Sequence, residues 1–171
     1  MASLVKLDIG CGQSKREGFT GMDIVKGEGV DVVHDWDRIP WPFNDASVAE
    51  INASHVLEHT KDLISFMDEC YRILVPEGKM TVVSPYYSSV RAWQDPTHVR
   101  AISEWTFMYF NRGWRETNKL THYPITADFD FTYGYNMNGD FQGRSNDHIQ
   151  WALRHYINVA DDIVVALTKR P

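Results

Sequence analysis

Residues 7–12, with the sequence LDIGCG, constrain the fold of this chain more than any other segment. Their apolar members alternate as in a buried strand, and Gly10 and Gly12 follow where that strand should end. Because glycine has no Cβ, both positions let the backbone approach a bound ligand closely. A second strand, predicted over 19–24, brings Asp23 to its tip, where a carboxylate can accept hydrogen bonds from ribose hydroxyls. We therefore interpret the two segments as parts of a nucleoside-cofactor site.

Strands and helices alternate through the first half of the chain. Alternating or β-branched apolar residues predict strands over 4–9, 19–24, 30–34, 48–56 and 79–84. Apolar residues spaced three or four apart predict a helix over 61–74. This order is typical of a doubly wound, mostly parallel α/β sheet, whose strands end along one edge. The first crossover spans only about nine residues, 10–18, whereas a parallel crossover usually needs a dozen or more and contains a helix. We therefore expect abbreviated first crossovers.

The second half of the chain contains less regular patterns. They predict a short helix over 103–110, capped by Ser103, and a strand with one aromatic face over 129–135. A longer helix over 146–156 and a last strand over 163–167 follow. One or two of these late strands should be antiparallel. A chain of 171 residues suffices for one domain with a sizeable core but not for two. We expect a single domain over 1–171, with a cofactor-binding half, 1–86, and a substrate-side half, 87–171.

Charge and composition exclude several classes of partner. The formal net charge is −6, which argues against general nucleic-acid binding, because a phosphate backbone requires a basic face. No apolar run approaches the roughly 18 residues that a membrane span needs, and the N-terminus has no charged-then-apolar leader. The two cysteines, Cys11 and Cys70, suit a reducing compartment better than a disulfide framework. These features predict a cytoplasmic protein with no affinity for membranes.

Several segments resemble the class I S-adenosylmethionine-dependent methyltransferases, and within them the small type 11 group. They are residues 7–12 (LDIGCG), 21–23 (GMD), 34–36 (HDW), 55–59 (HVLEH) and 71–78 (YRILVPEG), with 95–98 (DPTH) echoing some members. In that family an acidic residue and Gly-x-Gly close the first strand, and a VLEH segment follows the fourth. The resemblance covers about residues 4–86. It implies a Rossmann-like fold, S-adenosyl-L-methionine as cofactor, and transfer of its methyl group to an acceptor (a transferase, EC 2.1.1.-).

The resemblance also implies roles for the residues at the first two strand ends. Gly10 and Gly12 would border the amino-acid part of the cofactor. Asp8 would orient that loop, or meet the cofactor ammonium through the loop or a water. Asp23 would bind the ribose hydroxyls, although a turn or cap residue is the alternative.

Four later residues complete the cofactor site that the resemblance implies. Asp35 would bind the adenine amino group, with Trp36 beside the ring. Ser54 and His55 would lie near the methionine moiety and the transferred methyl group. A turn or cap role is the alternative for Asp35, and a purely structural histidine is the alternative for His55.

The chain departs from the family pattern at three places. Ser14 replaces the third glycine of the loop, and the helix that normally follows is reduced to a turn or missing. Glu77 stands where the family generally has glycine. The loss of the helix weakens its dipole contribution to cofactor binding, so Ser14 and Lys15 could hold the cofactor directly. The missing third glycine also counts against a dinucleotide, whose pyrophosphate needs a helix N-terminus.

A catalytic base is needed if the acceptor is a hydroxyl or a protonated amine. His98 is the first candidate and His55 the second, with a loop histidine bonded to backbone as the alternative for both. The acceptor is expected to be a small molecule, and the sequence leaves its identity and the oligomeric state open. A non-catalytic remnant or partner subunit that binds S-adenosylmethionine is the alternative of a different class, favoured by the short crossovers.

Residues 55–59 also match the H-x-x-E-H pattern of inverted zinc proteases through His55, Glu58 and His59. That chemistry needs both histidines on one helical face, a third ligand and a base. Here the segment follows a strand, and the helix would begin near Thr60. Asp95 and His98 form an incomplete set of metal ligands. We therefore expect no metal site and regard a zinc hydrolase as the least favoured function.

Overall fold

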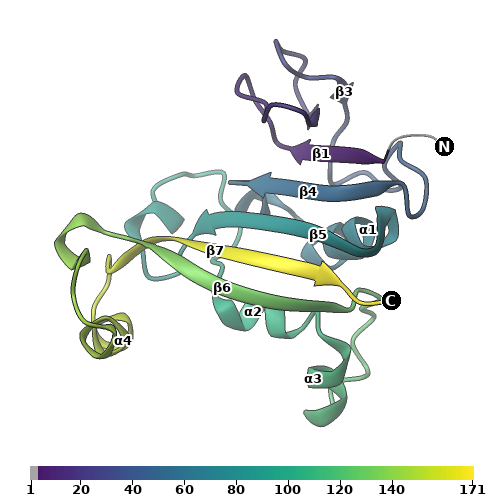
Figure 1. The fold of residues 1–171 in the computed structure, drawn as a ribbon. Helices are drawn as coiled ribbons and strands as arrows, with labels where there is room; N and C mark the ends of the chain where they lie inside the picture. The colour runs from purple at the N-terminus through teal and green to yellow at the C-terminus, as the bar shows by residue number, and fades with distance from the viewer. Residues whose placement is uncertain (1–3) are drawn as a thin grey trace.

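The structure, a computed structural model, describes residues 4–171 and is built on one seven-stranded sheet (Figure 1). The strands stand in the order β3-β2-β1-β4-β5-β7-β6. Their bounds are β1 Val5–Ile9, β2 Thr20–Asp23, β3 Val32–Val33, β4 Val48–Ser54, β5 Leu74–Pro85, β6 Phe129–Met137 and β7 Ala160–Lys169. The helices are α1 Leu63–Ile73, α2 Glu104–Met108, α3 Arg112–Thr117 and α4 Asn146–His155, with 3-10 turns η1 Leu57–His59, η2 Val90–Ala92 and η3 Gly139–Phe141.

The first five strands are parallel, and β7 runs antiparallel to both of its neighbours, β5 and β6. Ile9 at the end of β1 pairs with Met22 of β2 on one side and Ala53 of β4 on the other. The carboxyl ends of these strands therefore meet along one edge of the sheet, where open α/β sheets bind ligands. The predicted fold class, a mostly parallel Rossmann-like sheet with a late antiparallel strand, is confirmed.

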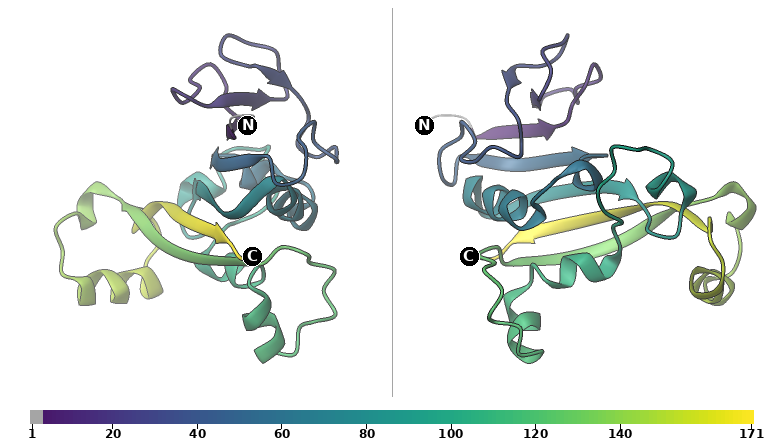
Figure 2. Two further views of the ribbon diagram at one scale, coloured as in Figure 1. Left: turned by 45° about the vertical axis from the view of Figure 1, so that its right-hand side comes forward. Right: turned by 180° about the vertical axis from the view of Figure 1, so that it is seen from behind.

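The sheet has one apolar and one polar face. On β5 the buried Met80 and Val82 alternate with the more exposed Lys79, Thr81 and Val83. The views from the front and from behind show α1 and α2 on one face, while no helix lies in front of the other (Figure 2). The core accordingly lies between the apolar face and these helices, where Phe66 and Phe107 are buried. The short first crossovers explain this one-sided covering, because they supply no helix to the second face.

The first two connections are as short as the sequence predicts. Between β1 and β2 the chain makes a turn, in which the Ser14 amide donates to the Cys11 carbonyl at 3.1 Å, and forms no helix. The third strand was predicted over 30–34, but β3 contains only Val32 and Val33. It lies at the sheet edge and pairs on one side only, so few ladder hydrogen bonds extend it.

Local capping explains where the helices begin. Asp62 accepts a hydrogen bond from the Ser65 amide at the start of α1, and Ser145 accepts one from the His148 amide at the start of α4. Ser103 forms a capping box with Thr106 at α2, as its sequence position predicts. Helix α3 was not predicted, because its surface is polar and only Arg115 is buried.

Among residues 4–171, no helix combines the length and the apolar character that a bilayer crossing requires.

Candidate functional site

The loop after β1 holds both glycines in the left-handed region, with φ of +65° at Gly10 and +51° at Gly12. A Cβ at Gly10 would overlap Val56 Cγ2, so no larger residue fits without movement of Val56. The Gly12 amide donates to Asp23 Oδ2 at 2.9 Å, and Asp23 Oδ1 accepts from the Val25 amide at 3.1 Å. This carboxylate therefore fixes the glycine loop against the tip of β2.

Asp8 is buried beneath the same loop and has two partners. Its Oδ2 accepts from the Arg16 amide at 2.8 Å, and its Oδ1 accepts from Asn52 Nδ2 at 2.6 Å. The Arg16 guanidinium in turn donates to Asn52 Oδ1 at 3.1 Å. The Arg16 backbone and side chain and the Asp8 and Asn52 side chains thus form a connected network that holds the far end of the loop on β1 and β4. The role of Asp8 toward a cofactor stays a prediction.

Lys15 is directed away from the glycines. Its Nζ lies 2.7 Å from Asp31 Oδ2, and the same oxygen accepts from the Gly21 amide at 2.7 Å. These hydrogen bonds, led by the one from Lys15, hold the pKa of Asp31 below its ordinary value. Lys15 lines neither of the hollows beside the glycine loop, so its direct contact with a cofactor stays a prediction.

A hollow of about 920 Å³ opens at the carboxyl ends of the parallel strands, within the size range of small-molecule sites. It extends from the glycine loop past the ends of β2 and β3 to the segment after β4. Its lining comprises Gly10, Asp23, Ile24, Val33, His34, Asp35, Trp36, Asp37, Arg38, His55, His59, Lys61, Thr97 and Val99. Five of the residues predicted to contact the cofactor thus line one cavity: Gly10, Asp23, Asp35, Trp36 and His55.

Asp35 and Trp36 lie in the loop after β3. Asp35 Oδ1 accepts from the Asp37 amide at 3.1 Å, and its Oδ2 lies 3.5 Å from Arg38 Nε. The Trp36 carbonyl accepts from Trp41 Nε1 at 3.1 Å, and Trp41 is buried against Phe66. The core thereby anchors the Trp36 backbone, while its ring borders the hollow.

A second hollow of about 490 Å³ shares only Gly10 with the first. It lies over the polar face of β1 and β4 and is lined by Asp8, Gly10, Cys11, Ser14, Arg16, Asn52, Ser54, Thr81 and Val83. Of the residues predicted for the amino-acid and methionine end of the cofactor, Asp8, Gly10 and Ser54 line this hollow, whereas His55 lines the larger one and Gly12 lines neither. Gly10 stands between Asp8 and Ser54 on one side and the predicted nucleoside contacts on the other.

His55 follows β4 in a left-handed conformation, with φ of +57°. Its Nδ1 lies 3.3 Å from Glu58 Oε1, and this contact raises the pKa of His55 against the opposing effect of burial. Burial raises the pKa of Glu58, but the contact with His55 and hydrogen bonds from its own backbone and Ser84 outweigh it and lower the pKa. His55 thus lines the hollow, and its Nδ1 contacts the buried carboxylate of Glu58.

His98, the first candidate base, does not line the hollow. Its Nδ1 bonds to the Ala92 carbonyl at 3.0 Å, and its ring lies 4.7 Å, centroid to centroid, from that of His59. His59 does line the hollow, and its Nδ1 lies 3.0 Å from Thr97 Oγ1. The structure therefore brings His55 and His59 to the cavity and places His98 beside His59.

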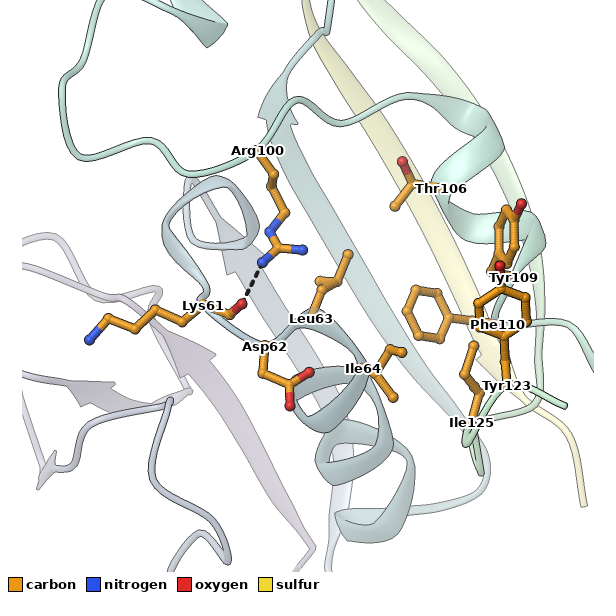
Figure 3. A pocket seen from close by; sticks show the side chains of 10 residues that line it. All are labelled: Lys61, Asp62, Leu63, Ile64, Arg100, Thr106, Tyr109, Phe110, Tyr123 and Ile125. Carbon is orange, nitrogen blue, oxygen red and sulfur yellow. Dashed lines mark hydrogen bonds between the residues drawn. The ribbon is translucent and has the colours of Figure 1, made fainter.

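A third hollow, of about 290 Å³, lies between the start of α1 and the segment from α2 to Ile125 (Figure 3). Leu63 and Ile64 face the aromatic ring of Phe110 across it. Arg100 closes one side by donating to the Lys61 carbonyl at 2.7 Å. Of the residues that line this third hollow, only Lys61 also lines the larger one. The third hollow is therefore separate from the glycine loop.

Sequence reasoning missed three residues of the site. Asn52 and Arg16 complete the network around Asp8, and His59 lines the large hollow. Asn52 could have been found, because it alternates with Ser54 on the polar side of a strand. Arg16 carries no such signal, because it stands in an irregular loop.

Comparison with known proteins agrees with this geometry. Residues 7–82 match a family model described as a methyltransferase domain. The matched region ends within β5 and so contains the glycine loop, Asp23, Asp35 and His55. No curated protein matches the sequence.

Solved structures resemble the whole chain. A SAM-dependent methyltransferase from Archaeoglobus fulgidus aligns over 98% of this chain and 87% of its own, with 19% identity and a TM-score of 0.67. Phosphoethanolamine N-methyltransferase 2 from Haemonchus contortus, in complex with S-adenosyl-L-methionine, aligns over 100% of this chain and 50% of its own, with 15% identity and a TM-score of 0.54. The [4+2]-cyclase SpnF aligns over 99% of this chain and 75% of its own, with 13% identity and a TM-score of 0.59.

The residues around the glycine loop suit this cofactor. Gly10 leaves no room for a Cβ, a carboxylate stands at the tip of β2, and polar side chains line both adjoining hollows. The match over residues 7–82 and the shared fold support methyl transfer in general and leave the acceptor open. Residues 7–82 are therefore similar to a methyltransferase domain, the whole chain shares the fold of S-adenosylmethionine-dependent methyltransferases, and both similarities support S-adenosylmethionine as the cofactor.

Proposed function

We propose that this protein transfers a methyl group from S-adenosylmethionine to a small-molecule acceptor. The observation that carries the proposal is the large hollow, which joins the predicted nucleoside contacts Asp23 and Asp35 to His55 in one cavity. The net charge of −6 disfavours a nucleic-acid acceptor, because the protein offers no excess of positive charge to a phosphate backbone.

The cofactor would lie across Gly10, which the two hollows share. Asp23 would accept hydrogen bonds from the ribose hydroxyls, and Asp35 would bind the adenine amino group beside Trp36. The amino-acid end would lie in the smaller hollow, near Gly12, Ser14 and Ser54. This assignment is supported by the lining residues and by the order of the two hollows along the strand ends.

S-adenosylmethionine supplies an electrophilic methyl group, so the chain's own contribution is alignment of the acceptor and exclusion of water. His55 is the proposed proton acceptor, because it borders the large hollow. His98 is the second candidate, but its ring lies beside that of His59 and does not line the hollow. This order reverses the preference drawn from the sequence, and its support is the position of the two side chains relative to the cavity.

Calorimetry with S-adenosylmethionine and its demethylated product, S-adenosylhomocysteine, tests the proposal. We expect both to bind with one-to-one stoichiometry, and turnover to appear in a panel of hydroxyl, amine and thiol acceptors. Failure of both to bind would refute the assignment of the hollows.

A second function is favoured by two observations. The first crossovers carry no helix in the described residues, and a cyclase shares this fold. A protein that binds S-adenosylmethionine without transferring its methyl group fits both. Binding without turnover across the acceptor panel would support this function over methyl transfer.

A further inference from the structure

Glu58, His59 and His98 form a cluster beside the large hollow. One carboxylate oxygen and one nitrogen of each imidazole all lie within 4.8 Å of one another. Glu58 and His59 belong to η1, whereas His98 lies in the loop that precedes α2. The DPTH segment alone supplied an incomplete ligand set, and the tertiary structure adds the missing members.

Hydrogen bonds orient both imidazoles of this cluster. The Ala92 carbonyl can only accept, so His98 Nδ1 donates to it and His98 Nε2 carries the lone pair. Thr97 Oγ1 donates its one proton to Asp95 Oδ1 at 2.7 Å and therefore accepts from His59 Nδ1. In the neutral form of both rings, these bonds leave the lone pair on Nε2 of His59 and of His98. Metal-binding histidines are commonly fixed in this way by a partner on the other ring nitrogen.

Glu58 supplies a buried carboxylate, one oxygen of which accepts no hydrogen bond from residues 4–171. Its side chain is 2% exposed, and its Oε2 accepts from Ser84 Oγ at 2.9 Å. Its Oε1 has no aligned hydrogen bond within residues 4–171, although His55 Nδ1 lies 3.3 Å away. A buried carboxylate oxygen without a donor is costly unless a cation or proton satisfies it.

The charges around the cluster favour a cation. Asp95 Oδ2 lies 4.0 Å from His98 Nε2, the nitrogen that carries a lone pair. In the part of the chain that the structure describes, the ion-pair contacts of Glu58 and Asp95 are with histidines, and neither carboxylate meets a lysine or arginine. Within residues 4–171, the Glu58 carboxylate and the two imidazoles of the cluster therefore lie together with no lysine or arginine in ion-pair contact with Glu58.

Backbone contacts hold the two halves of the cluster together. The Val99 amide donates to the Glu58 carbonyl at 2.9 Å. The Arg100 guanidinium donates to the Thr60 carbonyl at 2.6 and 3.0 Å, directly after His59. The loop that carries His98 is thus attached to η1 by interactions that do not involve the side chains of the proposed ligands.

We propose that Glu58, His59 and His98 bind a divalent transition metal ion, with Zn²⁺ as the best match. Two imidazoles and one carboxylate form a known zinc ligand set that leaves a fourth position open. Tetrahedral bonds of about 2.0–2.1 Å place ligand atoms roughly 3.4 Å apart, so the side chains close inward on binding. Since His59 lines the large hollow, the open coordination position would lie beside that hollow, where an oxygen of a bound substrate could reach it. The metal site itself does not depend on the proposed methyl transfer.

Titration of metal-free protein with Zn²⁺, and with Co²⁺ as a spectroscopic probe, tests the site. We expect one equivalent of Zn²⁺ to bind and Co²⁺ to give the strong visible absorption of a four-coordinate ion. Glu58→Gln, His59→Gln and His98→Gln should each weaken Zn²⁺ binding at least tenfold. Thr97→Val, which removes the partner of His59 Nδ1, should weaken it about 10- to 100-fold. His122→Gln, a histidine outside the cluster, should leave the affinity unchanged.

X-ray absorption at the zinc edge identifies the ligand atoms in the wild-type protein, so its result does not depend on whether a variant folds. Two imidazoles in the first coordination sphere would support the site. Absence of Zn²⁺ binding, a zinc spectrum with no imidazole, or wild-type affinity in the Glu58, His59 and His98 variants would overturn it. S-adenosylhomocysteine binding, measured separately without metal, reports on the proposed cofactor site, so failure of one proposal is distinguishable from failure of the other.

Discussion

The Gly12 amide donates a hydrogen bond to Asp23 Oδ2 at 2.9 Å and so connects the loop after β1 to the tip of β2. Asp23 lies in the large hollow, so one carboxylate both fixes the glycine loop and faces the proposed ribose position. An acid at this point therefore has a structural partner before any cofactor binds. In the proposed cofactor site, the carboxylate charge would serve mainly the ribose hydroxyls.

Asp23→Asn should separate these two tasks. The amide oxygen can still accept from Gly12, but the charge is lost, and hydrogen bonds to charged groups contribute about 1.5–3 kcal/mol. We expect the dissociation constant for S-adenosylhomocysteine to rise roughly 10- to 150-fold, as measured by calorimetry. Asp147→Asn on α4 is the matched control and should change nothing. Unchanged affinity in Asp23→Asn would exclude this residue from the cofactor site.

Lys15→Ala tests whether the loop replaces the missing helix. The sequence predicts direct cofactor contact, whereas the amine lies 2.7 Å from Asp31. Exposed ion pairs of this kind contribute about 0–1 kcal/mol. We therefore expect the affinity for S-adenosylmethionine to fall no more than about fivefold. A loss as large as that of Asp23→Asn would show that the amine leaves Asp31 to bind the cofactor.

Gly10→Ala should destabilise the fold by about 2–4 kcal/mol, because the new Cβ overlaps Val56 Cγ2 and φ is positive. Gly12→Ala has the same backbone strain and open space around its Cβ, so it should cost about 1 kcal/mol. Urea denaturation of both variants gives the comparison. In a double-mutant cycle, Val56→Ala should recover part of the loss at Gly10 and none at Gly12.

The N-cap of α1 predicts a pH dependence of stability. Hydrogen bonds from the Ser65 hydroxyl and amide hold the pKa of Asp62 below its ordinary value. Because the folded pKa is the lower one, the stabilisation is present above the unfolded value of about 3.9 and is lost as the pH falls through the folded value. Asp62→Ala should cost about 0.5–2 kcal/mol at pH 7.

Acid denaturation of the same variants checks the sign. The difference in free energy of unfolding between wild type and Asp62→Ala should shrink below about pH 4. Asp62→Asn keeps a neutral cap acceptor, so the difference in free energy of unfolding between Asp62→Asn and Asp62→Ala should not change with pH. A difference that grows in acid would contradict the assignment.

The local sequence determined most of the elements and their order. Alternation predicted β1, β4 and β6, and three- to four-residue apolar spacing predicted α1. Ser103 marked the start of α2. The short loop between β1 and β2 also followed from residue count alone. These features depend on neighbours in the chain, because periodicity, capping and glycine geometry act within a few residues.

Only the tertiary structure decided which side chains meet. Lys15 pairs with Asp31, and Arg16 with Asn52 of a different strand. His55 and His59 line the large hollow, whereas the His98 ring lies beside it and bonds to the Ala92 carbonyl. Such pairings require the sheet and its loops to be assembled first, since they join residues far apart in the chain. The elements around the cofactor site were therefore predictable, whereas the proposed metal ligands became visible only in the folded molecule.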